Sequence, residues 1–100
     1  MSDERITQLE GHIMSKAFKR AVKTNVGRTA REEAIQTLVE NDERRNLAVL
    51  VRTSGLRGEF RRQAIDGLGR CPGADLLEDL AEDRSLEPAL RRRAEELCRR

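Results

Sequence analysis

The side chains that could carry out chemistry are few and lie far apart in the sequence. There is one histidine, His12, and there are two cysteines, Cys71 and Cys98. A histidine can act as a general base and a cysteine as a nucleophile, but each needs a partner group within hydrogen-bonding distance. No such partner is evident for His12, and the cysteines form no CxxC pair of the kind that binds zinc. The sequence therefore predicts no enzyme, no metal site and no cofactor.

Adjacent acidic residues are the other arrangement that could catalyse a reaction. Glu32 and Glu33 form one such pair, and Glu95 and Glu96 form another. Both pairs lie in segments with a helical pattern, where neighbouring side chains diverge by about 100°. They cannot form a facing catalytic pair within one helix, so they leave the prediction unchanged.

The composition indicates one all-α domain. The 100 residues suffice for a single domain with a thin core. Leu and Ala dominate the apolar residues, and the scarce Gly and Pro lie between segments with helical periodicity. The 20 basic and 18 acidic residues give a formal net charge of +2, so any electrostatic signal must be local. Seventeen of the basic residues are Arg, a bias that reflects either coding composition or function.

The first residues, MSDERITQLEGHI, lack the basic start and the continuous apolar run of a signal peptide. No stretch approaches the length of a transmembrane helix. We therefore expect a cytoplasmic protein with reduced thiols and no membrane partner.

A repeat of thirty residues organises the chain from about residue 28. Short turns at Asn41-Asp42 and Pro72-Gly73 occupy the same place in successive units. Gly27 is suited to ending the helix that precedes the first unit. Three copies align without a gap, with the columns Ala30, Phe60, Leu90; Arg31, Arg61, Arg91; and Ala34, Ala64, Ala94.

This repeat predicts helices at 29–40, 44–53, 58–70, 74–83 and 88–98, after an amphipathic segment at 2–23 that is one helix or is divided at Gly11. The predicted fold is a short α-solenoid of antiparallel helix pairs, with five to six helices in one domain. Residues 1–27 form an N-terminal capping helix or a degenerate half-unit, 28–56 the first repeat, 57–86 the second, and 87–100 a C-terminal capping helix.

The predicted core follows the apolar columns of the repeat. The helix around Leu47 to Val51 should be the most enclosed, because five apolar residues follow one another there. Cys98 aligns with Leu38 and Leu68 and is predicted to be a core residue. The predicted core is Ile6, Leu9, Ile13, Phe18, Ala34, Ile35, Leu38, Leu47, Leu50, Phe60, Ala64, Ile65, Leu68, Leu77, Leu80, Leu90 and Ala94.

The repeat also carries a family resemblance. The pattern φ-R-x-x-A-x-x-x-L, seen as FRRQAIDGL at 60–68, followed by the short helix ADLLEDLAED at 74–83, resembles the HEAT-like repeat, in particular the short version named after phycobilisome lyases. The resemblance covers about residues 28–100 and departs in the third copy, where Glu95 replaces an isoleucine, as suits a terminal unit. It implies that the second helices of the units form a concave binding face. A lyase activity does not follow from a family name.

Arg31, Arg61 and Arg91 fall inside the apolar arc of their helices, where a charge needs a partner. We expect their stems to run along the core and their guanidinium groups to bind carbonyls or carboxylates of the adjacent unit, a structural inter-repeat role that the resemblance also implies. Direct ligand binding is the alternative, and phosphate is the ligand best suited to it.

Charge segregation marks the candidate interaction surface. Its N-terminal part is basic and its C-terminal part is acidic, which suits a protein partner or head-to-tail association into a homo-oligomer. We therefore predict a non-catalytic protein–protein interaction or scaffold module. The candidate residues are Lys16, Lys19, Arg20, Lys23, Arg44, Arg45, Arg52, Asp75, Asp79 and Glu82.

Nucleic acid is the alternative partner, because the basic N-terminal segment could contact phosphates. The acidic residues at 75–83 would repel the same backbone, and the absence of Tyr and Trp disfavours base stacking. Cys71, before Pro72 in a predicted turn, is expected to be exposed, either as an ordinary thiol or with a pKa lowered modestly by Arg70.

Overall fold

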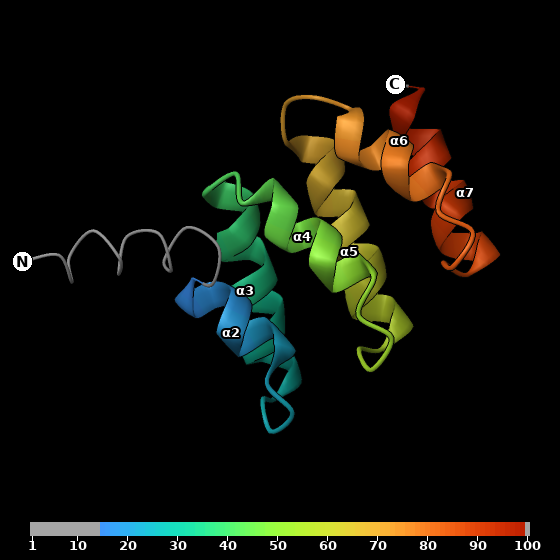
Figure 1. The fold of residues 1–100 in the computed structure, drawn as a ribbon. Helices are drawn as coiled ribbons and strands as arrows, with labels where there is room; N and C mark the ends of the chain where they lie inside the picture. The colour runs from blue at the N-terminus through green and yellow to red at the C-terminus, as the bar shows by residue number, and fades with distance from the viewer. Residues whose placement is uncertain (1–14, 100) are drawn as a thin grey trace, which may run out of the picture.

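Six α-helices, labelled α2 to α7 in Figure 1, account for the regular structure of residues 15–99, which are the residues that the computed structural model describes. No strand occurs in that range, so the predicted all-α fold of five to six helices is confirmed. The helices are α2 Lys16–Val22, α3 Arg28–Glu40, α4 Arg44–Val51, α5 Gly58–Arg70, α6 Asp75–Ala81 and α7 Pro88–Cys98.

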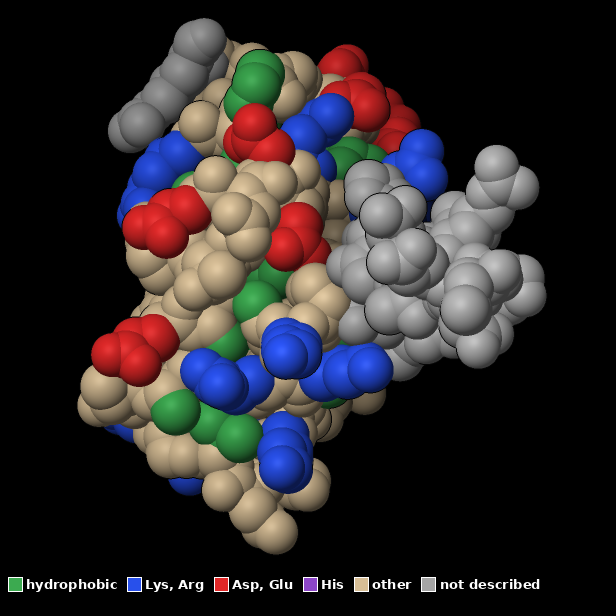
Figure 2. Space-filling view, turned by 90° about the vertical axis from the view of Figure 1, so that its left-hand side faces the viewer, with side chains coloured by type: hydrophobic (Ala, Val, Ile, Leu, Met, Phe, Trp, Pro, Cys, Tyr) green, Lys and Arg blue, Asp and Glu red, His purple; other side chains and the backbone are tan. Residues whose placement is uncertain are grey.

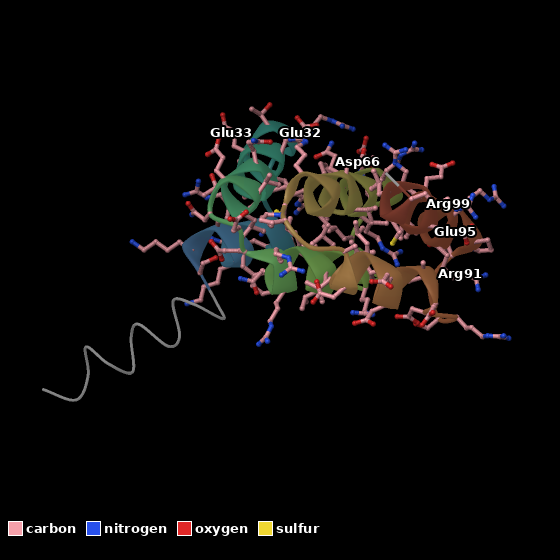
Figure 3. All side chains as sticks on the ribbon, turned by 90° about the horizontal axis from the view of Figure 1, so that it is seen from above. Glu32, Glu33, Asp66, Arg91, Glu95 and Arg99 are labelled. Carbon is pink, nitrogen blue, oxygen red and sulfur yellow. The ribbon has the colours of Figure 1, made fainter. Side chains whose placement is uncertain are left out.

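The helices lie in two layers, with α3, α5 and α7 in one and α2, α4 and α6 in the other (Figure 3). The most extensive packing joins α2 to α3, α4 to α5 and α6 to α7. The chain from residue 16 therefore forms three helical hairpins, each made of a short helix followed by a longer one. Neighbouring hairpins stack mainly through α3 on α5 and α5 on α7, as in a solenoid, where each unit contacts only the next.

The boundaries of the helices agree with local signals in the sequence. Pro88 stands at the first turn of α7, where its missing N–H leaves no hydrogen bond unmade. Gly27 was predicted to end the helix before it, and this is wrong. Gly27 is the N-cap of α3, with a φ of −69°, and α2 ends five residues earlier at Val22.

The core matches the predicted apolar columns within the described residues. Every predicted core residue from Ala34 to Ala94 is buried, and Phe18 is half-buried against the core. The predicted core residues Ile6, Leu9 and Ile13 lie outside the described residues.

Four of the five apolar residues from Leu47 to Val51 are buried, which agrees with the predicted enclosure of this helix. Val49 is 47% exposed although its neighbours in α4 are buried, because it lies about 200° around the helix from Leu47. The prediction that Cys98 is a core residue is wrong, because Cys98 is half-buried whereas Leu97 is buried. The equivalent Leu38 and Leu68 are covered by a following hairpin, and α7 is the last helix that the structure describes.

One close approach fixes how the first two hairpins meet. A Cβ atom added at Gly67 would lie 2.5 Å from Cγ2 of Val39, and it would also contact Leu47. Because a valine side chain is stiff about its first torsion, this site admits only glycine at the observed helix separation. The repeat therefore has a glycine here in its second copy and larger residues, Thr37 and Leu97, in the others.

Candidate interaction surface

Arg31 and Arg61, the fourth residues of α3 and α5, reach back to the end of the preceding helix. Arg61 is only 6% exposed. Its Nε donates to the carbonyl of Val51 at 2.7 Å, and its Nη1 donates to Glu87 Oε1 at 3.1 Å. Val51 is the last residue of α4, so its carbonyl has no partner within the helix. The guanidinium of Arg61 thus caps α4 and joins the second hairpin to the third.

The equivalent arginines are satisfied less completely. Arg31 donates to the carbonyl of Lys23, at the end of α2, and its guanidinium lies 5.2 Å from the centroid of the Phe60 ring. The buried Nε atoms of Arg31 and Arg91 have no hydrogen-bond partner among residues 15–99. The three positions therefore share a place in the fold, and only Arg61 makes two hydrogen bonds there.

A set of ion pairs connects the two sequence repeats, 28–56 and 57–86. The two residues of each pair lie 31 positions apart. Arg28 forms a bidentate contact with Glu59: its Nη1 donates to Oε2 at 2.9 Å and its Nη2 donates to Oε1 at 2.7 Å. Arg52 donates to Asp83 at 2.7 Å. Arg44 pairs with Asp75 in the same way. The first pair joins α3 to α5, and the other two lie between α4 and α6, so the pairs hold neighbouring helices of the same layer in register.

These arginines lower the pKa of their partners. The hydrogen bond from Arg52, helped by those from Ser85, lowers the pKa of Asp83 to about 2. The hydrogen bonds from Arg28 and Arg44 likewise lower the pKa values of Glu59 and Asp75. Because a group with a depressed pKa favours the folded state only while it is ionised, these pairs make the fold sensitive to acid.

We expect Asp83→Asn to reduce the loss of stability in acid. The contribution of ionised Asp83 is fully present above its ordinary pKa of 3.8 and is lost as the pH falls toward about 2. The wild-type free energy of unfolding, measured with urea across that range, should therefore fall more steeply than that of Asp83→Asn. Asp79→Asn removes an exposed acid of α6, the helix that precedes Asp83, and should follow the wild-type slope. Equal slopes for wild type and Asp83→Asn would contradict the assignment.

The ion pairs divide the predicted interaction residues into two groups. Arg44, Arg52 and Asp75 are held by partners within the chain. No ion pair joins the remaining residues to the part of the chain that the structure describes. These remaining residues are Lys16, Lys19, Arg20, Lys23, Arg45, Asp79 and Glu82.

The four bases of α2 lie together around an apolar hollow. Lys16, Lys19, Arg20 and Lys23 line it together with Val26, Ala30 and two loop residues at the start of α3. Figure 2 faces this end of the molecule and shows Lys and Arg side chains gathered around hydrophobic atoms. The hollow has a volume of about 720 Å³. It could hold apolar side chains of a partner while the surrounding bases attract acids.

Three acids without an ion pair in the described part of the chain lie on α6 or at its C-cap, in the same layer as α2. Glu78, Asp79 and Glu82 are exposed, and no ion pair joins them to residues 15–99. Arg45, on α4 between the two groups, is exposed as well. The layer of short helices is therefore basic at α2 and acidic at α6.

The opposite end of the stack is formed by α7. Figure 3 shows Arg91, Glu95 and Arg99 at that end, and Glu95 is exposed, as predicted for a terminal unit. Arg99 donates to Glu95 at 2.6 Å. Arg93, on the same helix, binds Asp66 of α5 at 2.7 Å and so connects the last two hairpins.

The prediction that Cys71 is exposed is wrong, and so is the alternative that Arg70 lowers its pKa. The side chain is 7% exposed. Burial raises the pKa of its thiol, and the nearby Asp42 raises it further, which together outweigh the opposing effects of Arg44 and Arg70. Burial also raises the pKa of the Cys98 thiol. Both cysteines therefore favour the thiol form over the nucleophilic thiolate.

Several residues that shape this surface were not predicted. Glu59, Asp83 and Glu87 bind arginines from neighbouring units, and Arg57 lines a pocket described below together with Phe60, which was predicted only as a core residue. A search for opposite charges 31 residues apart would have found the first two. The Arg61–Glu87 pair has a spacing of 26 residues, and no periodicity in the sequence indicates it.

Within 15–99, no three His, Cys, Asp or Glu side chains are placed to hold a metal ion together. None of the helices there has both the length and the apolar character that crossing a membrane requires.

Comparison with known proteins gave no match for this chain. No family model matches the chain, and no significant match was found among curated proteins or solved structures.

Proposed function

We propose that this chain is a non-catalytic, HEAT-like scaffold module that binds a protein partner through its layer of short helices. The observation that carries the proposal is the segregation of charges that remains after the internal ion pairs are removed. Four bases surround an apolar hollow at α2, and three acids lie on α6. An acidic, partly apolar segment of a partner would complement the α2 end.

The internal ion pairs support this role by making the surface preformed. Arg44–Asp75 and Arg52–Asp83 connect α4 to α6 on the proposed binding layer, and Arg61 ties α4 to α5 and to Glu87. A surface that is already ordered loses less conformational entropy when a partner binds. Stacked helical units offer such a surface, because each unit extends the one before it.

Nucleic acid remains the second candidate because of the bases on α2. Their attraction for phosphates would be opposed by Glu78, Asp79 and Glu82 on the same layer. Head-to-tail self-association is a further arrangement that the segregated charges allow. The experiments below distinguish these outcomes.

The test is affinity capture from a lysate of the native source, followed by mass spectrometry. The wild type and Lys19→Glu/Arg20→Glu are compared after nuclease treatment. Arg62→Glu, which reverses an exposed base on α5 outside the α2 surface, serves as the control. We expect a defined protein to be retained by wild type and Arg62→Glu and lost from the α2 variant.

Two other results would overturn the proposal. Loss of all captured material on nuclease treatment, with salt-sensitive binding of duplex DNA in fluorescence polarisation, would establish the nucleic-acid alternative. Dimers or longer assemblies in light scattering that dissolve in Lys19→Glu/Arg20→Glu would identify a second copy of the chain as the partner.

A further inference from the structure

A second basic hollow lies at the edge of the molecule where the loops connect the short helices to the long ones. It is formed between the α2–α3 loop and the α4–α5 loop and has a volume of about 440 Å³. None of the described residues that line the hollow is acidic. Four of its lining residues are bases, namely Lys23, Arg28, Arg31 and Arg57. Among these, only Lys23 also belongs to the α2 surface, so this hollow is a separate feature.

The thirty-residue repeat provides an internal comparison for this hollow. The next junction, between the second and third hairpins, contains Arg61 where the first contains Arg31. There, Glu87 supplies a carboxylate to Arg61. Glu87 is the N-cap of α7, and the equivalent N-cap of α5 is Arg57. The first junction therefore has a base, Arg57, at the position where the second junction has Glu87, the acid that binds Arg61.

The backbone at these two positions is almost identical. Arg57 has φ −61° and ψ 146°, and Glu87 has φ −61° and ψ 143°. The two side chains thus leave the main chain in the same direction relative to their helices. The difference between the junctions is a difference of charge. Lys23 and Arg57 at the first junction correspond to Thr53 and Glu87 at the second, and Thr53 of the first junction corresponds to Asp83 of the second.

The first junction consequently has unused donors for an anion. The buried Nε of Arg31 has no hydrogen-bond partner among the described residues, and an unsatisfied buried donor is costly. Arg28 is held by Glu59, whereas no ion pair joins Lys23 or Arg57 to residues 15–99. The ring of Phe60 lies beneath both Arg28 and Arg31, at 5.6 and 5.2 Å from their guanidinium carbons, and it holds these two groups in place.

The helices add to the positive potential. Both α3 and α5 are 13 residues long and begin at the edge of the hollow, and neither N-cap, Gly27 or Arg57, makes a side-chain capping bond. The first N–H groups of such helices carry partial positive charge. This effect adds to that of the arginines and does not by itself define a site.

From this charge inversion we infer that the hollow at the first junction binds a phosphate group, which takes the place that the Glu87 carboxylate occupies at the second junction. The phosphate is either free or the monoester of a small molecule. Its oxygens accept hydrogen bonds from Arg31 and Arg57, and Lys23 contributes a further charge. This inference does not depend on the proposed protein partner.

The decisive variant is Arg57→Glu, which reproduces the charge of the second junction. Wild type, Arg57→Glu and the matched control Arg62→Glu are titrated with inorganic phosphate and with O-phosphoserine at constant ionic strength. Binding is followed by thermal unfolding and by the amide NMR signals of Thr24 and Gly55, both of which line the hollow. Comparison between the variants is needed because phosphate stabilises most proteins nonspecifically.

We expect phosphate to raise the wild-type Tm by roughly 5 °C or more at ten times its Kd. Arg57→Glu should bind at least about tenfold more weakly, because it loses one charge-assisted contact and introduces a repelling acid. Without phosphate it should be at least as stable as wild type, since its carboxylate can bind Arg31. Arg62→Glu should bind like wild type. Tighter binding of O-phosphoserine would identify a monoester as the ligand, and equal binding would identify free phosphate.

Three results would overturn the inference. One is the absence of phosphate-dependent shifts at Thr24 and Gly55 in the wild type. Another is equal weakening by Arg57→Glu and Arg62→Glu, which would indicate a general effect of charge. The third is a folded Arg57→Glu variant that binds phosphate as tightly as wild type does.

Discussion

Leu50→Ala is expected to lower the free energy of unfolding by about 2–5 kcal/mol, the usual range for a buried leucine. Leu50 is fully buried in α4, the helix that packs on α5 and also contacts α3 and α6. Its removal would leave a cavity where these helices meet, and helices joined by ion pairs would close it only in part. Urea unfolding followed by circular dichroism at 222 nm measures the effect.

Val49→Ala is the control for this experiment because it removes an apolar side chain from the neighbouring position. Val49 is 47% exposed, so the change should alter stability by no more than about 0.5 kcal/mol. A large loss for Val49→Ala with a small loss for Leu50→Ala would show that α4 is rotated from the orientation described.

Arg61→Ala is expected to cost about 2–3 kcal/mol, mainly because the carbonyl of Val51 loses its donor in a buried place. The packing of the arginine stem is lost as well. Glu87→Gln should cost less than about 1 kcal/mol, because the Glu87 side chain is 67% exposed. Urea unfolding of both variants would therefore separate the capping of α4 from the ion pair.

Arg91→Ala tests the same idea at the equivalent position of the repeat. The Nε of Arg91 has no partner among the described residues, so this variant should lose less stability than Arg61→Ala. If Glu87→Gln proved as harmful as Arg61→Ala, the ion pair rather than the carbonyl contact would be the main contribution of Arg61.

The fold could be predicted well from the sequence because its signals are local and repeated. Alignment of three copies marked the apolar columns, and Pro, Gly and Asn residues marked the turns, so α5 and α7 match their predicted ranges. The exposure of Val49 was not predicted, because a run of apolar residues does not show which of them a helix turns toward solvent. The error at Cys71 arose because a residue beside Pro72 can still be covered by its neighbours.

The surface was predicted less completely because pairing depends on how the helices are placed side by side. The sequence predicts Arg44, Arg52 and Asp75 on the interaction surface but does not reveal that each has a partner within the chain. The difference between Arg57 and Glu87 is visible in the sequence. Its importance becomes clear only when the two N-caps are seen to share a backbone conformation and Glu87 is seen to bind Arg61.

The stacking of three hairpins also has a kinetic consequence. Each hairpin contacts only its neighbours, so contacts between distant parts of the sequence are few and the loops closed during folding are short. Helical proteins with such local contacts fold in microseconds to milliseconds. A chain of this design spends little time with its apolar columns exposed, and it can therefore reach its folded state before unfolded molecules aggregate.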